Sequence, residues 1–158
     1  MDENAKKKGL RMIPYGLQVL GAKHGDKSTV ASVNWTTQVS FAPPLVVVGV
    51  KADSTAHELV KQSKKFTLSF LGTGQKDLGF AFFKHVEPKD GKYGNYAYRD
   101  GNNGCPIIVD APAAGEFKVV EFIERGDHSI VVGELTDAHL SRESDPLTLK
   151  ECGVNYGG

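Results

Sequence analysis

The sequence predicts a mainly β, antiparallel barrel fold in which two or more short helices interrupt the strands. Three observations support this. Short apolar segments rich in β-branched residues dominate the chain, turn signals join several of them, and the regular strand–helix alternation of a doubly wound sheet does not occur. The 158 residues are enough for one compact domain with its own core. We expect residues 12–158 to form this domain and residues 1–11 to form a flexible N-terminal tail.

The first hairpin is predicted between residues 16 and 33. Apolar and small residues from Gly16 to Lys23 form a strand-like segment, and the returning strand covers Ser28 to Val33. His24-Gly25-Asp26-Lys27 lies between them and is a turn signal.

A buried strand is predicted from Leu45 to Val50, because this valine-rich run is too short for a typical helix. It follows the double proline Pro43-Pro44, which ends a small polar loop. Asp53 or Ser54 can cap the next helix, which we expect over roughly residues 57–63.

Further elements follow in order. Residues 66–71 alternate as a strand, and residues 75–84 are predicted to be helical with Leu78, Phe82 and Phe83 facing inward. Residues 86–104 are rich in Gly, Asn, Asp, Lys and Tyr, so we expect a long irregular excursion there.

The last third of the chain is predicted to hold a short strand at 107–109 and a long hairpin. Its two strands, 116–124 and 128–139, are joined by Arg125-Gly126-Asp127. The tail from Cys152 onward has no periodicity, and no internal repeat is present.

Composition excludes several classes of function. The formal net charge is zero, which argues against a broad nucleic-acid or anionic-membrane surface. No apolar run has the length of a signal peptide or a membrane helix. Cys105 and Cys152 are far apart in sequence, which fits a reducing cytoplasm and predicts no zinc site. We therefore expect a cytoplasmic protein without a metal, a nucleic-acid partner or a membrane partner.

Two familiar motifs are incomplete. Gly72-Thr73-Gly74 begins like a dinucleotide fingerprint, but Asp77 replaces the third glycine, so a glycine-rich turn is the better interpretation. His57-Glu58 resembles the start of a metalloprotease motif, but Lys61 stands where the second zinc-binding histidine would be.

The polar loop and the following helix start suit a ligand with a flat polar ring and a phosphate. Backbone N–H groups and the Asn34 amide can bond the polar edge of a ring, and Trp35 can pack near it. The simpler interpretation of this loop is a polar strand edge and turn. At the helix start, free N–H groups and the helix dipole favour an anion. Ser54 and Thr55 lie there, Lys51 offers a positive charge, and Asp53 is unfavourable unless it faces away.

Two blocks of the chain resemble the flavin reductase-like family. Residues 31–59 are similar to that family's Ser/Thr loop, Pro-Pro and strand, and residues 124–135 to its Gly-Asp-His strand. The resemblance extends over roughly 12–158, including residues 83–88, residues 104–107 and the Asn-Tyr-Gly-Gly ending.

The resemblance implies a homodimeric, six-stranded antiparallel split β-barrel with FMN at the dimer interface. It also implies that NAD(P)H reduces the flavin and that the electrons pass to a further acceptor, with a partner oxygenase or electron-transfer protein as possible recipients. Side chains need to supply mainly orientation, stacking and hydrogen bonds in such chemistry.

The resemblance assigns individual residues. The residues expected at the cofactor are Ser32, Val33, Asn34, Trp35, Thr36, Thr37, Lys51, Ser54, Thr55 and Tyr156. Thr36 and Thr37 would reach ribityl or phosphate oxygens, and Tyr156 would fold over the flavin rather than be disordered. The family's Ser-x-Thr pattern would put the threonine at Ala56, so either Ser54 or Thr55 contacts the phosphate. His128 would orient the nicotinamide beside the flavin; otherwise it is a solvated turn residue.

Two alternatives stay open. One is a non-enzymatic FMN protein that carries electrons from a partner and does not use NAD(P)H. The other is a relative of the pyridoxamine phosphate oxidases on a similar barrel, but the chain lacks the arginine-rich C-terminal strand that such enzymes use for their substrate.

Overall fold

The computed structural model describes all 158 residues and is mainly β. Its strands are β1 (Gln18–His24), β2 (Lys27–Val33), β3 (Thr36–Ser40), β4 (Leu45–Lys51), β5 (Lys65–Phe70), β6 (Pro88–Lys89), β7 (Lys92–Tyr93), β8 (Tyr96–Asp100), β9 (Pro106–Ile108), β10 (Ala113–Glu124) and β11 (His128–Leu140). Its helices are α1 (Glu3–Leu10), α2 (Thr55–Ser63), α3 (Lys76–Ala81) and α4 (Leu149–Cys152). The predicted mainly β class with short helices is confirmed.

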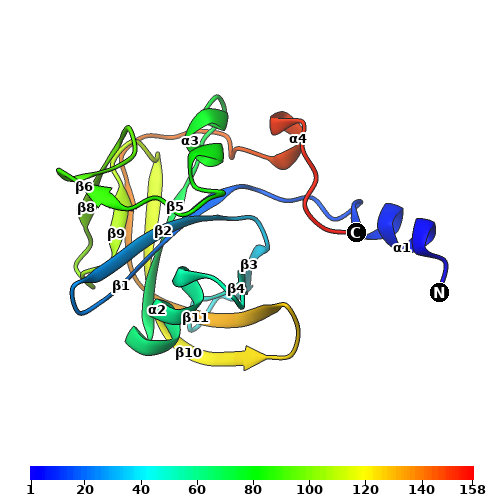
Figure 1. The fold of residues 1–158 in the computed structure, drawn as a ribbon, viewed down its shortest axis with the longest axis horizontal. Coiled ribbons are helices and arrows are strands. Elements are labelled where there is room, and N and C mark those ends of the chain that lie inside the picture. The colour runs from blue at the N-terminus through cyan, green and yellow to red at the C-terminus, as the bar shows by residue number, and fades with distance from the viewer.

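Seven strands form one antiparallel sheet in the order β2-β1-β5-β10-β11-β4-β3. The sheet coils strongly, and β2 at one end also contacts β4 near the other (Figure 1). The predicted barrel had six strands. The sheet has one more because residues 36–40, predicted as loop, pair with β4 as an edge strand.

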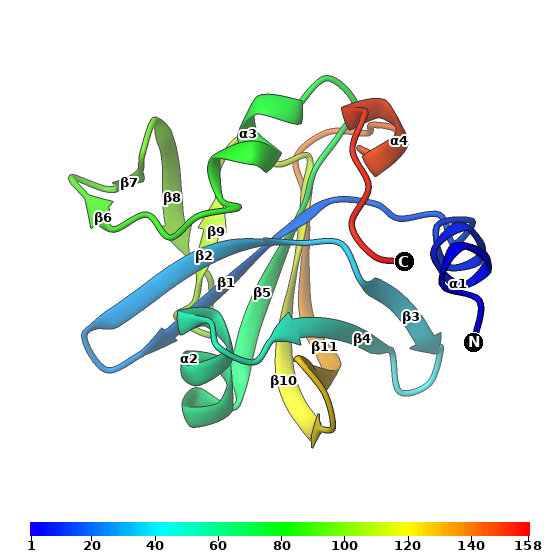
Figure 2. The same ribbon diagram turned by 45° about the vertical axis from the view of Figure 1, so that its right-hand side comes forward.

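The first core cluster lies inside the coiled sheet and under α2. Figure 2 shows α2 at the end of the sheet, between the β1–β2 hairpin and β4. Ser54 caps this helix by accepting a hydrogen bond from the amide of His57, and the helix ends at Lys64, which has a positive φ of 58°. The apolar face of α2, with Leu59 and Val60, belongs to the same buried cluster as Leu68 and Phe117 of the sheet.

The second core cluster lies on the other side of β1, where α3, α4 and the small sheet β6-β7-β8-β9 meet. The irregular excursion predicted for residues 86–104 is therefore wrong in part, because β6, β7 and β8 lie there. Tyr93 of β7 is fully buried and connects this small sheet to β2, because its hydroxyl forms a hydrogen bond of 2.7 Å with the hydroxyl of Ser28. Burial raises the pKa of Tyr93 to about 12.

Several boundaries differ from those predicted. Helix α3 is shorter than the predicted 75–84, and only Leu78 and Phe82 of the three inward-facing residues are buried, whereas Phe83 is 53% exposed. The single turn α4 was not predicted. It precedes the tail, and the side chain of Thr148 caps it. Both hairpin turns lie where the sequence predicted them, at Gly25-Asp26 and at Arg125-Gly126-Asp127.

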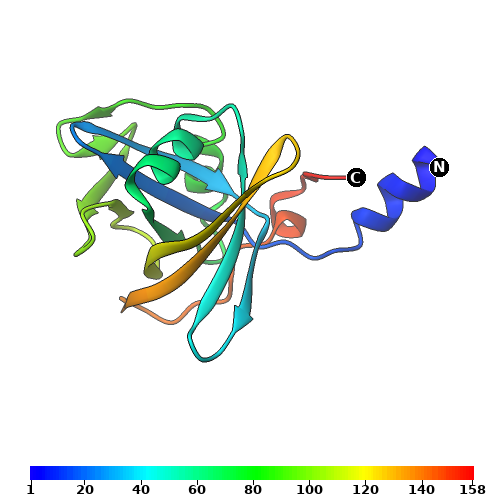
Figure 3. The same cartoon turned by 90° about the horizontal axis from the view of Figure 1, so that it is seen from below.

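Residues 1–11, which we expect to be a flexible tail, include the helix α1 and its C-cap Arg11. This helix buries no residue and projects from the body, as seen from below in Figure 3. The C-terminus ends beside it, and Arg11 Nε donates a hydrogen bond to the carbonyl of Gly157. None of the four helices has both the length and the apolar character that crossing a membrane requires.

Candidate functional site

A cavity of about 280 Å³ opens where the end of β2, the end of β4, the start of α2 and the C-terminal tail converge. The Ala31–Trp35 segment lines it, together with Gly49, Val50, Lys51, Ser54 and Ala56. Phe82, Phe83, His128, Leu149, Val154, Asn155 and Tyr156 complete the lining. This volume is slightly below the range of roughly 300–1,000 Å³ that is usual for small-molecule sites.

Most of the predicted site residues lie on this cavity. They are Ser32, Val33, Asn34, Trp35, Lys51, Ser54, His128 and Tyr156. The structure does not place Thr36, Thr37 or Thr55 on the wall. Thr36 and Thr37 belong to the edge strand β3, where the exposed Thr37 hydroxyl donates to the carbonyl of Gln38. Of the two hydroxyls proposed for a phosphate, only that of Ser54 belongs to a cavity residue.

Two buried hydrogen-bond donors on the wall have no protein partner. They are the side-chain amide nitrogen of Asn34 and the indole nitrogen of Trp35. Asn34 is only 8% exposed, so leaving its amide unpaired is costly in free energy. Both residues line the cavity, so a ligand with acceptor atoms would satisfy these donors.

The two serine hydroxyls of the site already donate to the protein. Ser32 donates to the carbonyl of Gly79 at 2.5 Å, and its amide donates to the carbonyl of Phe82, which ties β2 to the end of α3. Ser54 donates to the carbonyl of Lys51 at 2.7 Å and caps α2. Each serine therefore positions backbone around the cavity, and Ser54 orders a helix start whose first N–H groups lack intrahelical partners.

The charges at the helix start are balanced. Lys51 Nζ lies 3.1 Å from the Asp53 carboxylate, and both side chains are largely exposed. Asp53 is not part of the cavity lining, whereas Lys51 is. The sequence indicated that the Asp53 carboxylate would oppose phosphate binding unless it faced away. In the structure this carboxylate pairs with Lys51 and is not part of the cavity lining.

His128 forms an aromatic cluster with Trp35 and Tyr156 at the head of β11. The His128 ring centroid lies 4.5 Å from that of Trp35, and its Nε2 lies 2.9 Å from the Tyr156 hydroxyl. Its Nδ1 lies 2.9 Å from the carboxylate of Asp127, and this hydrogen bond lowers the pKa of Asp127. The carboxylate can only accept, so Nδ1 carries the proton and Nε2 of the neutral ring accepts from Tyr156.

A second histidine, His57, connects the start of α2 to β11 next to the site. His57 Nε2 bonds the hydroxyl of Ser129 at 2.8 Å, and its ring meets the edge of Phe122. Burial lowers the pKa of His57. This histidine joins the first turn of α2 to β11, next to His128, and therefore fixes the helix start against the strand.

Gly49, Phe82, Phe83 and Asn155 are among the nine lining residues that sequence reasoning missed. Gly49 had a detectable signal, since it interrupts a run of valines. A Cβ at Gly49 would lie 3.1 Å from the Trp35 ring, so the glycine lets the indole pack flat against β4. The other three reach the cavity only because α3 and the tail fold over it, and no local pattern predicts that.

Comparisons with known proteins relate this chain to one family. A family model described as flavin reductase like domain matches residues 10–157. Among curated proteins, the high molecular weight rubredoxin of Moorella thermoacetica is 28% identical over 144 residues, which cover 89% of this chain and 62% of the rubredoxin. The chain spans between 24% and 62% of the length of the first curated relatives it matches.

Solved structures share the fold as well. An NADH:FAD oxidoreductase of Streptomyces globisporus superimposes with a TM-score of 0.75 at 27% identity, over 86% of this chain and 76% of the other. An FMN-binding protein of Thermus thermophilus superimposes with a TM-score of 0.72 at 28% identity, over 81% of this chain and 71% of the other.

Proposed function

Because this chain belongs to the flavin reductase-like family, we propose that it binds FMN in the cavity beside Trp35 and reduces the flavin with NAD(P)H. The observation that carries this proposal is the pair of unpaired buried donors, Asn34 Nδ2 and Trp35 Nε1, on the wall of that cavity. The carbonyl oxygens and ring nitrogens at the polar edge of a flavin are acceptors, so they match these donors.

The remaining lining residues suit the other parts of FMN. Trp35, Phe82 and Tyr156 provide aromatic and apolar surface for a flat ring system. Lys51 and the start of α2 at Ser54 provide a positive charge and free N–H groups for a phosphate. Thr36, Thr37 and Thr55 do not line this cavity, although the Thr36 hydroxyl is also buried without a hydrogen-bond partner.

A bound flavin supplies the hydride acceptor, so the protein has to bind and orient the two cofactors and exclude water. We assign the orientation of the nicotinamide to His128. Asp127 and Trp35 hold the imidazole in one tautomer and one plane. Nε2 is the acceptor atom of this tautomer, so the carboxamide N–H₂ group would donate to it in place of the Tyr156 hydroxyl.

Anaerobic mixing of the FMN-loaded protein with NADH or NADPH tests the proposal. The visible absorbance of the flavin should bleach within seconds with at least one of the two. An alternative function, a non-enzymatic FMN electron carrier, is favoured by the similarity to a protein named as a rubredoxin. That alternative predicts tight FMN binding and no bleaching by either dinucleotide.

Replacing His128 by alanine should slow flavin reduction while leaving FMN affinity nearly unchanged. One neutral hydrogen bond contributes about 0.5–1.5 kcal/mol, so the KM for NAD(P)H should rise roughly threefold to tenfold. Stopped-flow reduction kinetics measure the effect. His24→Ala is the matched control, because His24 is exposed at the β1–β2 turn. Wild-type kinetics in His128→Ala would remove the residue from the site, and loss of FMN would place it at the flavin.

We also propose that the chain forms a homodimer, as the family resemblance implies. The β3–β4 hairpin exposes Phe41 by 91% and Val39 by 52%, and burying such side chains stabilises an interface. Light scattering of the purified protein should give twice the chain mass, and Phe41→Asp should shift the equilibrium toward monomer. A wild-type monomer that binds FMN fully would contradict the dimer. A partner oxygenase or electron-transfer protein would receive the electrons.

A further inference from the structure

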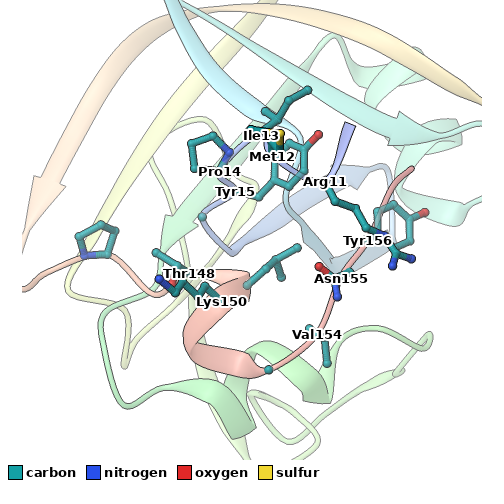
Figure 4. A pocket seen from close by; sticks show the side chains of 14 residues that line it. Arg11, Met12, Ile13, Pro14, Tyr15, Thr148, Lys150, Val154, Asn155 and Tyr156 are labelled. Carbon is teal, nitrogen blue, oxygen red and sulfur yellow. The ribbon is translucent and has the colours of Figure 1, made fainter. Parts of the chain in front are cut away.

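The C-terminal tail, residues 153–158, separates the cavity beside Trp35 from a second and larger one. The second cavity has a volume of about 740 Å³ and lies between residues 11–16 and residues 146–156. Figure 4 shows it, with the labelled side chains of three tail residues along one side. Four residues line both cavities: Leu149, Val154, Asn155 and Tyr156. Moving the tail would therefore open the smaller cavity toward the larger one.

Few contacts hold the tail in this place. No residue from 153 onward is buried, and none belongs to a strand. Beyond Val154, two hydrogen bonds connect the tail to the rest of the protein. The Tyr156 hydroxyl donates to Nε2 of His128 at 2.9 Å, and the carbonyl of Gly157 accepts from Arg11 Nε at 3.3 Å. Exposed segments with so few contacts open at a low cost in free energy.

The tail lies over the groups that the proposed function assigns to the flavin and its reductant. The Tyr156 ring centroid lies 5.4 Å from that of Trp35, and the Tyr156 hydroxyl occupies the acceptor atom of His128. A Cβ built on Gly157 would lie 3.5 Å from Cζ2 of Trp35 and 3.7 Å from its Nε1, so the backbone of this glycine covers the indole. With the tail in this place, a ring cannot approach the indole N–H from that side.

The other walls of the smaller cavity have less freedom to move. Most of their residues belong to β2, β4, β11 or the start of α2, and these elements contribute to a buried cluster of the fold. Moving any of them would break strand pairing or expose apolar core, whereas moving the tail breaks two hydrogen bonds. The tail is therefore the lining segment whose displacement costs the least free energy.

From these observations we propose that the tail is a gate through which FMN enters and leaves the cavity. FMN passes when the Tyr156 hydroxyl leaves His128, and the gate closes again when this bond re-forms beside the bound flavin. The inference rests on the proposed function, since it takes FMN as the ligand. Because the bond exists before and after FMN binds but not during its passage, it slows both association and release and leaves the equilibrium affinity unchanged.

Tyr156→Phe is the sharpest test, because it removes the bond to His128 and keeps an aromatic ring beside the flavin. The rate constants for FMN association and release should each increase about threefold to tenfold, the effect of one hydrogen bond, while the dissociation constant stays the same. Stopped-flow quenching of flavin fluorescence measures both rates. The matched control is Tyr15→Phe, because Tyr15 lines only the larger cavity and its hydroxyl forms no hydrogen bond. This control should exchange FMN at the wild-type rates.

Two further variants isolate the gate. In a His128→Ala background the Tyr156 hydroxyl has no acceptor, so adding Tyr156→Phe should not change the exchange rates further. Gly157→Ala removes no hydrogen-bonding group, but it strains a residue whose φ is 115°, a conformation that favours glycine. This variant should therefore loosen the tail and speed FMN exchange in the same direction as Tyr156→Phe.

Trp35 is the only tryptophan of the chain, so its fluorescence reports the position of the tail without any flavin. In the flavin-free protein, acrylamide should quench Trp35 more strongly in Tyr156→Phe and Gly157→Ala than in the wild-type protein or in Tyr15→Phe. Equal quenching in all four proteins would overturn the gate alone. Failure of all four to bind FMN would instead refute the proposed function, and the gate's role in flavin entry with it.

The kinetic results can also overturn the proposal. If Tyr156→Phe exchanges FMN no faster than Tyr15→Phe does, the tail is not a barrier to the flavin. If Tyr156→Phe weakens FMN binding by raising only the release rate, the Tyr156 hydroxyl belongs to the flavin site rather than to a gate. If its effect persists in the His128→Ala background, the bond between these two residues is not what closes the cavity.

Discussion

FMN should bind this protein about 100-fold more tightly than riboflavin, a difference of about 2.7 kcal/mol. Two groups that riboflavin cannot use are responsible: the Lys51 ammonium and the free N–H groups at the start of α2. Hydrogen bonds to a charged partner each contribute about 1.5–3 kcal/mol, and exposure of Lys51 to solvent reduces its share. Quenching of flavin fluorescence measures both affinities.

Single substitutions measure the contributions of Lys51 and of the start of α2 to FMN binding separately. Lys51→Glu should lower the preference for FMN over riboflavin about tenfold, whereas Lys27→Glu, at the exposed start of β2, should not change it. Ser54→Ala should weaken FMN more than Thr55→Ala does, because only Ser54 caps α2 and lines the cavity. Equal affinities of the wild-type protein for FMN and riboflavin would contradict the assignment of the phosphate to this helix start.

Replacing Glu116 by alanine should destabilise the fold by about 3–4 kcal/mol. Glu116 is 1% exposed, and its carboxylate accepts hydrogen bonds from the amides of Asn102 and Asn103 and from Nε2 of His139. Alanine would leave these donors without their acceptor and open a cavity under the loop that joins β8 to β9. Denaturant unfolding measures the change in the free energy of unfolding.

Two substitutions test whether the carboxylate itself matters. Glu116→Gln keeps the shape and one acceptor oxygen, so it should destabilise by less than alanine does. Glu121→Ala lies on the same strand with an exposed side chain and should have little effect. A Glu116→Ala protein as stable as Glu121→Ala would show that the network contributes nothing.

Acid should weaken this same network. Burial opposes ionisation of Glu116, but the hydrogen bonds from His139 and the two amides outweigh it, so the pKa of Glu116 is lowered in the folded state. A lowered folded pKa means that the stabilisation is complete above the unfolded pKa, about 4.3, and is lost as the pH falls through the folded value. The stability of Glu116→Gln should therefore depend less on pH below about 5 than that of the wild-type protein.

The same cluster illustrates how a candidate metal site can be a structural network. Glu116, Asp137 and His139 place ligand atoms within 4.8 Å of one another. Both oxygens of Glu116 already accept hydrogen bonds from the protein, and Asp137 accepts one from the Asn102 side chain. These bonds account for the buried carboxylate, and we propose no metal there.

Local signals in the sequence were sufficient to predict part of the fold. Alternating apolar residues and turn residues predicted β1, β2, β4, β5, β10 and β11 to within a few residues, because each strand faces one core. Ser54 marked the start of α2 because a side-chain cap depends on neighbouring residues. The polar loop and the Gly-Asp-His turn identified five of the residues that line the smaller cavity, namely Ser32, Val33, Asn34, Trp35 and His128.

The other elements and lining residues depend on tertiary structure, because the contacts that stabilise them come from residues distant in sequence. The strand β3 exists as an edge partner of β4, and β6 to β8 form around Tyr93, which is buried against β2. Phe82 and Asn155 reach the cavity beside Trp35 through the folding of α3 and the tail. The cavity of about 740 Å³ forms only because residues 11–16 and residues 146–156, from the two ends of the chain, lie side by side. Local periodicity reports which face of an element is buried, but not which distant segment buries it.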